Sequence, residues 1–245
     1  MRRFYVDAGT VQGRRATLGP ELAWRLSRVL RLRPGEKLLL FDGSGKEWEV
    51  ELVSISPKAV TATVLADHPS PPEPAVRLRL FAGLVKEPRF ELVLEKATEL
   101  GVAEIVPVVT RRSVVRPWKE GSAKQERWRR IVIEATEQCG RARPPELSSP
   151  VPLPEAVRLA SGLRLLPWEG ERERGIQEPL SRARGSVAEV SLLVGPEGGL
   201  EADEVELARQ AGFQVVSLGR RVLRAETAAL VAAALVLYEL GEFSP

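Results

Sequence analysis

A proline-rich segment, Pro69-Ser-Pro-Pro-Glu-Pro74, divides the sequence into two parts with different patterns. Four prolines in six residues favour an extended, semi-rigid connection. Short strand patterns precede this segment, whereas strands alternate with helices after it. At 245 residues the chain is long enough for two domains with real cores. We therefore expect one domain over residues 1–70 and a second over residues 71–245.

The first part predicts a small β-barrel-like domain with one helix. Strands are expected at 2–6, 37–41, 47–55 and 59–65, with Asp42-Gly-Ser-Gly45 and Ser56-Pro-Lys58 as hairpin turns. Apolar residues recur at helical spacing in 20–30, where Pro20 suits the first turn of a helix.

The second part predicts an α/β domain. Strands are expected at 76–81, 104–109, 163–167, 189–194 and 215–218, and helices at 88–100, 122–139, 153–160, 201–211 and 225–240. Strands that alternate with helices are typical of a mainly parallel sheet. The segment 227–240 is apolar almost all round, which predicts burial in the core or in a subunit interface.

Cysteine and histidine occur once each, as Cys139 and His68. One cysteine forms no disulfide within the chain, and one histidine builds no histidine-rich metal site, so we expect no metal centre. A Ser-His-Asp hydrolase is disfavoured because His68 lies beside the proline-rich segment. The N-terminus lacks the apolar run of a signal peptide, and the longest uncharged apolar run, 227–238, is shorter than the roughly 20 residues of a membrane span. We expect a cytoplasmic protein.

Positive charge is concentrated in two blocks, although the formal net charge is only +3. Residues 1–33 hold eight arginines and two acidic residues, and residues 111–143 hold ten basic residues and four glutamates. Each block therefore carries +6 and the remaining chain −9. Such a distribution is typical of a protein that binds a polyanion. The alternative is that the arginines lie on solvated helix faces and cover apolar surface with their stems.

The first candidate site segment is Leu192-Leu-Val-Gly-Pro-Glu-Gly-Gly-Leu200, in which a predicted strand runs into a glycine-rich loop with one carboxylate. Ligands of α/β proteins bind at the carboxyl ends of the strands, and glycines let the backbone approach a ligand closely. The loop matches neither the dinucleotide-binding pattern nor the P-loop, which disfavours a phosphate cradle. A tight strand-to-helix turn is the alternative.

The second candidate segment is Leu218-Gly-Arg-Arg-Val-Leu-Arg-Ala-Glu-Thr-Ala-Ala229, which also follows a predicted strand. Its apolar residues indicate a backbone that wraps a flat, uncharged group, while its arginines face an anion. The alternative is an ordinary helix start, at which the helix dipole favours Glu226.

Together the two segments resemble the α/β-knot (SPOUT) RNA methyltransferases. Further motifs narrow the resemblance: Val29-Leu-Arg-Leu32, Phe41-Asp-Gly43, Glu95-Lys-Ala-Thr-Glu-Leu-Gly-Val102, Thr110-Arg-Arg-Ser-Val114 and Glu134-Ala-Thr-Glu-Gln-Cys-Gly-Arg141. The combination extends over nearly the whole chain and is similar to the RsmE family of small-subunit rRNA uridine-N3 methyltransferases. The resemblance implies a PUA-like, RNA-binding β-barrel, followed by a trefoil-knotted SPOUT domain that binds S-adenosylmethionine and forms a homodimer.

The resemblance also implies where the cofactor binds. It would lie among three loops, with backbone groups of Leu218, Gly219 and Leu223 around the adenine and a hydroxyl from Thr227. The expected cofactor-binding residues are Leu166, Pro167, Trp168, Gly195, Pro196, Glu197, Gly198, Leu218, Gly219, Leu223 and Thr227.

Methylation of a uridine N3 in 16S rRNA needs alignment of the two reactants and loss of the N3 proton, and therefore a base or a cation that stabilises the uridine anion. Arg224 is the candidate stabiliser and Glu197 the candidate base, with bracing of its own loop as the alternative for Glu197. Arg141 or Arg112 would hold the nearby phosphate or base.

The RNA contacts are expected from both basic blocks and from one lysine. The residues are Arg2, Arg3, Arg28, Arg31, Arg33, Lys86, Arg111, Arg112, Arg129 and Arg143. Because two distant blocks imply a large surface, we expect the assembled small ribosomal subunit rather than naked 16S rRNA as the partner.

Two other functions stay open at this point. Another knotted methyltransferase, acting on tRNA or on ribose 2′-oxygens, would carry similar loops. A non-catalytic RNA-binding factor for ribosome assembly would have lost the cofactor, and the intact loops argue against it.

Overall fold

The computed structural model describes residues 1–115 and 121–243, which form two compact units. The first unit contains Met1–Glu73 and Thr136–Pro144. The second contains the described residues of Pro74–Ala135 and Pro145–Pro245. The first unit thus combines the N-terminal residues, up to Glu73 in the proline-rich segment, with residues 136–144 from the middle of the chain.

A six-stranded sheet forms the first unit. Its strands are β1 (Arg3–Tyr5), β2 (Val11–Gln12), β3 (Arg15–Leu18), β4 (Lys37–Phe41), β5 (Lys46–Ile55) and β6 (Val60–Pro69), paired in the order β1-β4-β5-β6-β3-β2. The β1–β4 pair is parallel and the other pairs are antiparallel. Alternate strand residues such as Phe4, Leu40 and Leu52 form the core. Helix α1 (Pro20–Trp24), continued by the π-helix η1 (Arg25–Val29), buries Ala23 and Leu26 against it.

The apolar pattern predicts the longer strands of this unit and its helix. The strand expected at 37–41 coincides with β4, and the helix expected at 20–30 is α1 with η1. Strand β6 extends to Pro69, because it pairs along the length of β5 up to Lys46. Strands β2 and β3 are not predicted, since they are too short for a recognisable alternation.

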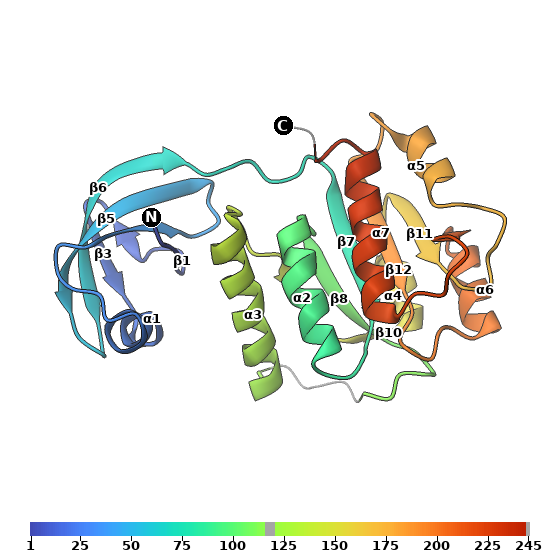
Figure 1. Ribbon diagram of the computed structural model, residues 1–245, viewed down its shortest axis with the longest axis horizontal. Helices are drawn as coiled ribbons and strands as arrows, with labels where there is room; N and C mark the ends of the chain where they lie inside the picture. Colours follow the sequence, from blue (N-terminus) through green and yellow to red (C-terminus); the bar gives the residue numbers. More distant parts are fainter. Residues whose placement is uncertain (116–120, 244–245) are drawn as a thin grey trace. The chain divides into compact units, whose positions relative to one another are not determined.

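A seven-stranded sheet with helices on both faces forms the second unit (Figure 1). Its strands are β7 (Arg77–Gly83), β8 (Glu104–Val109), β9 (Glu146–Leu147), β10 (Val151–Pro152), β11 (Leu163–Pro167), β12 (Glu189–Val194) and β13 (Gln214–Val216). They pair in the order β10-β8-β7-β12-β11-β13, with β9 beside β8, and all the pairs are parallel. The expected α/β domain with a parallel sheet is confirmed.

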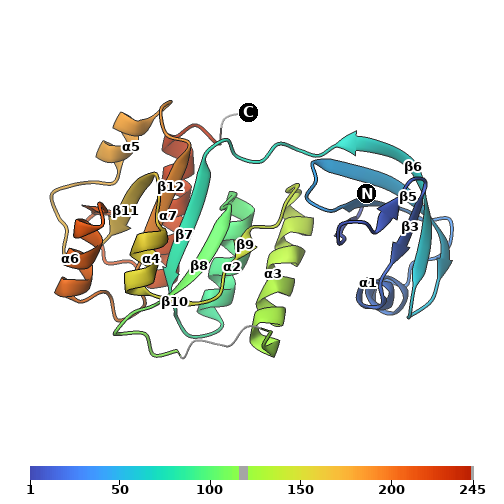
Figure 2. The same ribbon diagram turned by 180° about the vertical axis from the view of Figure 1, so that it is seen from behind.

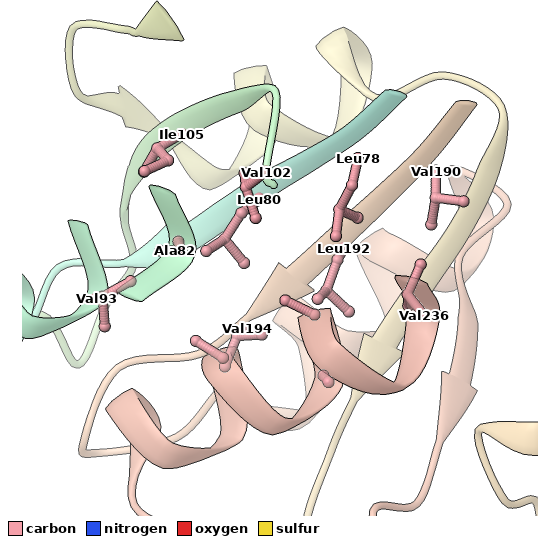
Figure 3. Close-up of a cluster of buried hydrophobic side chains, with 14 of the residues drawn as sticks. Leu78, Leu80, Ala82, Val93, Val102, Ile105, Val190, Leu192, Val194 and Val236 are labelled. Atoms are coloured by element: carbon pink, nitrogen blue, oxygen red, sulfur yellow. The ribbon is translucent and has the colours of Figure 1, made fainter. Parts of the chain in front are cut away.

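Two apolar cores cover the two faces of this sheet. On one face lie residues of α2 (Arg89–Leu100), α3 (Ala123–Cys139), α5 (Gln177–Ala183) and α7 (Ala225–Glu239). On the other lie α4 (Leu153–Leu159) and α6 (Ala202–Gln210), which Figure 2 shows in front of the strands. Strand β7 alternates between the cores, with Leu78 and Leu80 in the first and Phe81 in the second. Figure 3 shows Leu78, Leu80 and Leu192 on the face of the sheet toward α7, which carries Val236.

Helix α7 is the apolar helix expected at 225–240, and it packs in the first core through residues such as Ala229, Ala233 and Leu237. Helix α2 ends at Gly101 as predicted, in the left-handed conformation with φ +103° that glycine adopts readily. Helix α5 is not predicted because Leu180 is the only aliphatic side chain longer than alanine in its seven residues. Within the described part of the chain, no helix combines the length and apolar character needed to cross a bilayer.

Candidate active site

A cleft of about 800 Å³ opens at the carboxyl ends of three neighbouring strands, β11, β12 and β13. The loop after β11 contributes Trp168, the loop after β12 contributes Gly195, and the loop after β13 contributes Leu218. Arg89 at the start of α2 and Arg224 before α7 complete the wall. The sequence predicts the loops after β12 and β13 as candidate sites, because the carboxyl ends of parallel strands meet at one edge of a sheet. The loop after β11 is expected from the family resemblance.

Eight of the eleven expected cofactor-binding residues line this cleft: Pro167, Trp168, Gly195, Pro196, Glu197, Leu218, Gly219 and Leu223. The other three lie outside its lining. Leu166 is fully buried in the second core, Gly198 lies against Arg112, and Thr227 is exposed on α7.

The side chain of Glu197 connects the glycine-rich loop to Lys86 and Arg89. Its Oε1 accepts a hydrogen bond from the backbone N–H of Lys86 at 3.1 Å and lies 3.5 Å from Nη1 of Arg89. Within the loop, the N–H of Gly199 donates to the carbonyl oxygen of Pro196 at 2.9 Å and closes a turn. Glu197 therefore braces its loop while its side chain also lines the cleft.

Close approaches on other sides explain the glycines of this loop. A Cβ on Gly198 would stand 2.9 Å from Cβ of Arg112, whose side chain donates a hydrogen bond to the carbonyl oxygen of Gly198 at 2.8 Å. Gly199 has φ +70°, and a Cβ there would collide with the carboxylate of Glu169. The positive φ favours glycine at position 199, since the carboxylate of Glu169 stands at the end of a flexible side chain and could move aside.

The wall of the cleft carries both signs of charge as well as apolar surface. Its cations are Arg89, Arg172, Arg220, Arg221 and Arg224, and its carboxylates are Glu169, Glu171, Glu173 and Glu197. The backbone N–H groups of Glu173 and Arg174 donate to Oε1 of Glu171 at 2.9 and 3.2 Å and hold the pKa of that carboxyl below its usual range. The cleft thus offers negative charge to a cationic group of a ligand. Beside this charge it offers apolar surface to a flat, uncharged group.

Arg89 is not singled out in the sequence analysis, which places Glu226 at a helix start without predicting its burial. Arg89 lines the cleft within ion-pair distance of both Glu197 and Glu226. Glu226 opens α7 and is only 7% exposed. The one signal in the sequence is the position of Arg89 just after β7, at the same edge of the sheet as the three loops.

Two arginines that the sequence analysis assigns to RNA or to the substrate, Arg3 and Arg141, have carboxylate partners within the first unit. The side chain of Arg3 is ion-paired with Glu47, and it lies 4.5 Å from the ring centroid of Phe41. Arg141, expected near the substrate, contacts Glu73 through Nε at 2.9 Å and Nη2 at 2.6 Å. Buried or half-buried arginines with such partners brace the fold, because leaving their partner carboxylates unpaired would be costly.

Arg143, and Arg111 and Arg112 after β8, also have hydrogen-bond partners within the protein. Arg143 donates to the carbonyl oxygen of Gly43 at 2.9 Å. Arg111 bonds Glu201 and Asp203, and these hydrogen bonds raise its pKa. Arg111, Arg112 and Arg143 are nevertheless exposed, as are six further residues expected to bind RNA: Arg2, Arg28, Arg31, Arg33, Lys86 and Arg129. In the described residues, histidine, cysteine, aspartate and glutamate form no group of three or more that could hold a metal ion.

Comparison with known proteins places this architecture in a family. Residues 71–237 match the model of an RNA methyltransferase domain, and residues 26–65 match that of an RNA methyltransferase PUA domain. A Synechocystis protein named ribosomal RNA small subunit methyltransferase E is 35% identical over 212 residues, which cover 85% of this chain and 68% of that protein.

Two solved structures resemble this chain over nearly all of its length. The ribosomal RNA small subunit methyltransferase E of Neisseria gonorrhoeae, bound to S-adenosyl methionine, is 32% identical with a TM-score of 0.87 and full coverage of both chains. A Legionella pneumophila structure described as a methyltransferase with bound cofactor SAM is 35% identical, with a TM-score of 0.88 and 96% coverage of each chain. The chain, a PUA-like sheet followed by a parallel-sheet SPOUT methyltransferase domain, therefore belongs to the RNA methyltransferase family of ribosomal RNA small subunit methyltransferase E.

Proposed function

We propose that this protein transfers a methyl group from S-adenosylmethionine to N3 of a specific uridine in the 16S rRNA of the small ribosomal subunit. The observation that carries the proposal is the cleft at the carboxyl ends of β11, β12 and β13. Relatives with bound S-adenosylmethionine support the choice of cofactor.

The residues of the cleft fit this cofactor. Leu218 and Leu223 offer apolar surface to an adenine ring. Gly219 has φ +110° and no atom within 4 Å of the place where a Cβ would stand, so a ligand can approach its backbone closely. The carboxylates of Glu169 and Glu171 offer negative charge to the cofactor's cationic groups. When bound, S-adenosylmethionine supplies an electrophilic methyl group on a sulfonium sulfur.

The protein's own task is to position the uridine and to manage the N3 proton. Arg224 lines the cleft, and as the N-cap of α7 it makes no side-chain capping bond. In our proposal its guanidinium stabilises the uridine anion, a contribution on the order of 100-fold in rate for comparable oriented donors. Glu197, whose side chain lines the same cleft, is the proposed proton acceptor.

The proposal extends to the partners of the enzyme. Exposed Arg2, Arg28, Arg31, Arg33, Lys86 and Arg129 would contact phosphates of the assembled small subunit. A homodimer would cover apolar side chains that are exposed on α2 and α7, namely Leu92 and Tyr238. We place the reaction in the cytoplasm, where ribosomes are assembled.

The test combines cofactor titration with identification of the product. Calorimetry with S-adenosylmethionine should show about one site per chain. Small subunits that lack the modification should then yield 3-methyluridine by nucleoside mass spectrometry. A 2′-O-methylated nucleoside or a methylated tRNA would instead indicate another knotted methyltransferase. RNA binding without cofactor binding, even with subunits present, would indicate a non-catalytic assembly factor.

A further inference from the structure

Arg89 lies between two carboxylates from different segments around the cleft. Its Nη1 is 3.5 Å from Oε1 of Glu197 in the glycine-rich loop. Its Nε is 3.7 Å from Oε1 of Glu226 in the first turn of α7. Because Arg89 itself begins α2, one side chain connects three segments that are far apart in sequence.

Glu226 needs this cation. The residue is 7% exposed, and its Oε2 is buried without a hydrogen-bond partner. The positive end of the α7 dipole favours a carboxylate at this position but supplies only a partial charge. A buried carboxylate is costly unless a cation pairs with it, so Glu226 favours a position of the Arg89 guanidinium close to it, although the side chain of Arg89 is 45% exposed.

The Arg89–Glu226 pair borders the wall of the cleft. A cavity of about 10 Å³ lies beside Glu226, and Val194, Gly195 and Ala225 line both this cavity and the main cleft. The end of β7 packs closely against the glycine-rich loop, since a Cβ on Gly83 would overlap the backbone of Pro196. Because these segments are closely packed, a displacement of Arg89 or Glu226 would also displace the glycine-rich loop.

We propose that Arg89 is a positioning residue: anchored by buried Glu226, it holds Glu197 and with it the turn Pro196–Gly199 in the conformation that methyl transfer requires. The part of this inference that concerns activity rests on the proposed function. The part that concerns the turn does not, because the turn can be observed in the protein alone.

The test separates positioning from charge compensation. Arg89→Met leaves Glu226 buried without its cation, so we expect a lower melting temperature and kcat/KM reduced by about 10- to 100-fold. The double variant Arg89→Met with Glu226→Gln removes the unpaired charge. It should recover the melting temperature while kcat/KM stays low. Arg89→Lys keeps a cation that can pair with one carboxylate at a time, and it should recover activity in part.

Hydrogen–deuterium exchange over residues 192–200 gives a readout that needs no substrate. We expect the amides of the turn to exchange faster in Arg89→Met and in the double variant than in the wild type. Arg127→Met is the matched control. Its Nη2 pairs at 2.8 Å with Glu91 of α2, whose side chain is 13% exposed and has a buried Oε1 without a hydrogen-bond partner. This control should lower the melting temperature without changing exchange in the turn.

Two outcomes would overturn the inference. One is a double variant that regains wild-type exchange and activity together with its melting temperature, since Arg89 would then only compensate charge. The other is unchanged exchange in Arg89→Met. An inactive wild-type protein would count against the proposed function alone, because the exchange measurement would still decide the role of Arg89.

Discussion

Arg112 donates a hydrogen bond from its Nη1 to the carbonyl oxygen of Gly198, at 2.8 Å, in the loop that borders the cleft. Its Nε also lies 3.6 Å from Oε1 of Glu201, just before α6. The neighbouring Arg111 pairs with the same Glu201 but not with the glycine-rich loop. Two adjacent arginines, both expected from their charge to bind RNA, thus differ in what they hold.

Arg112→Met should weaken cofactor binding by about fivefold, because the variant lacks a hydrogen bond of about 1 kcal/mol that orients the glycine-rich loop. Calorimetric titration with S-adenosylmethionine measures the change. Arg111→Met is the matched control, since the side chain of Arg111 pairs with Glu201 and Asp203 and not with the glycine-rich loop. Equal cofactor affinities for the two variants would contradict the bracing role of Arg112.

Gly83→Ala should abolish cofactor binding and lower the free energy of unfolding by about 1–3 kcal/mol. The new Cβ would overlap the backbone of Pro196, so either β7 or the loop must move. Gly19→Ala is the control, because Gly19 has φ −67° and no atom within 4 Å of the added methyl. Urea unfolding and calorimetry measure the two effects. Wild-type cofactor affinity in Gly83→Ala would show that this close approach does not set the loop.

Patterns that depend on neighbouring residues predict much of this fold. Apolar runs locate β8 and β12, and Gly101 marks the end of α2. Two of the site loops, after β12 and β13, are predictable for a related reason, since parallel strands bring their carboxyl ends to one edge. The loop after β11 is expected only from the family resemblance. The strand order could not be predicted from such patterns, because it follows from packing between distant segments and leaves no trace in the local sequence.

Charge alone does not show which arginines are paired within the fold. Arg3 and Arg28 look alike in sequence, yet Arg3 is paired with Glu47 and Arg28 is exposed. Arg89 shows the converse, because its partner Glu197 lies more than a hundred residues away and no spacing relates them. Ion pairs of this kind appear only once the chain is folded.

The buried carboxyl of Glu104 should make stability depend on acid pH. Burial alone would raise its pKa, but hydrogen bonds and charge, above all from Arg79 at 2.7 Å, outweigh burial and hold the pKa below its usual range. A carboxyl whose pKa is lower in the folded state contributes stability above its unfolded value of about 4.3, and this contribution disappears as pH falls through the folded value.

Glu104→Gln should therefore be most destabilised relative to wild type near pH 7, with the difference shrinking below about pH 4. Urea unfolding at several pH values measures it. Glu146→Gln is the control, since the side chain of Glu146 is 68% exposed and its pair with Arg77 contributes little. A difference between Glu104→Gln and wild type that stays constant from about pH 3 to pH 7 would refute the linkage.

Arg224→Ala should remove turnover and spare cofactor affinity. The side chain lines the cleft without capping α7, so its loss costs the helix little. Single-turnover methylation and calorimetry separate the two quantities, and Arg224→Lys should recover part of the rate because a cation remains. Unchanged turnover in Arg224→Ala would assign the anion to another group.

Joint replacement of Arg28, Arg31 and Arg33 by Gln should weaken RNA binding without lowering the melting temperature, because all three are exposed. For each arginine that binds a phosphate, its replacement should reduce the slope of log affinity against log salt concentration by about one. Arg141→Gln is the contrasting variant. It breaks the pair with Glu73 inside the first unit, so it should lower the melting temperature and leave the salt slope nearly unchanged. If instead the triple variant keeps the wild-type slope while Arg141→Gln reduces it, then Arg141 binds phosphate and the exposed arginines do not.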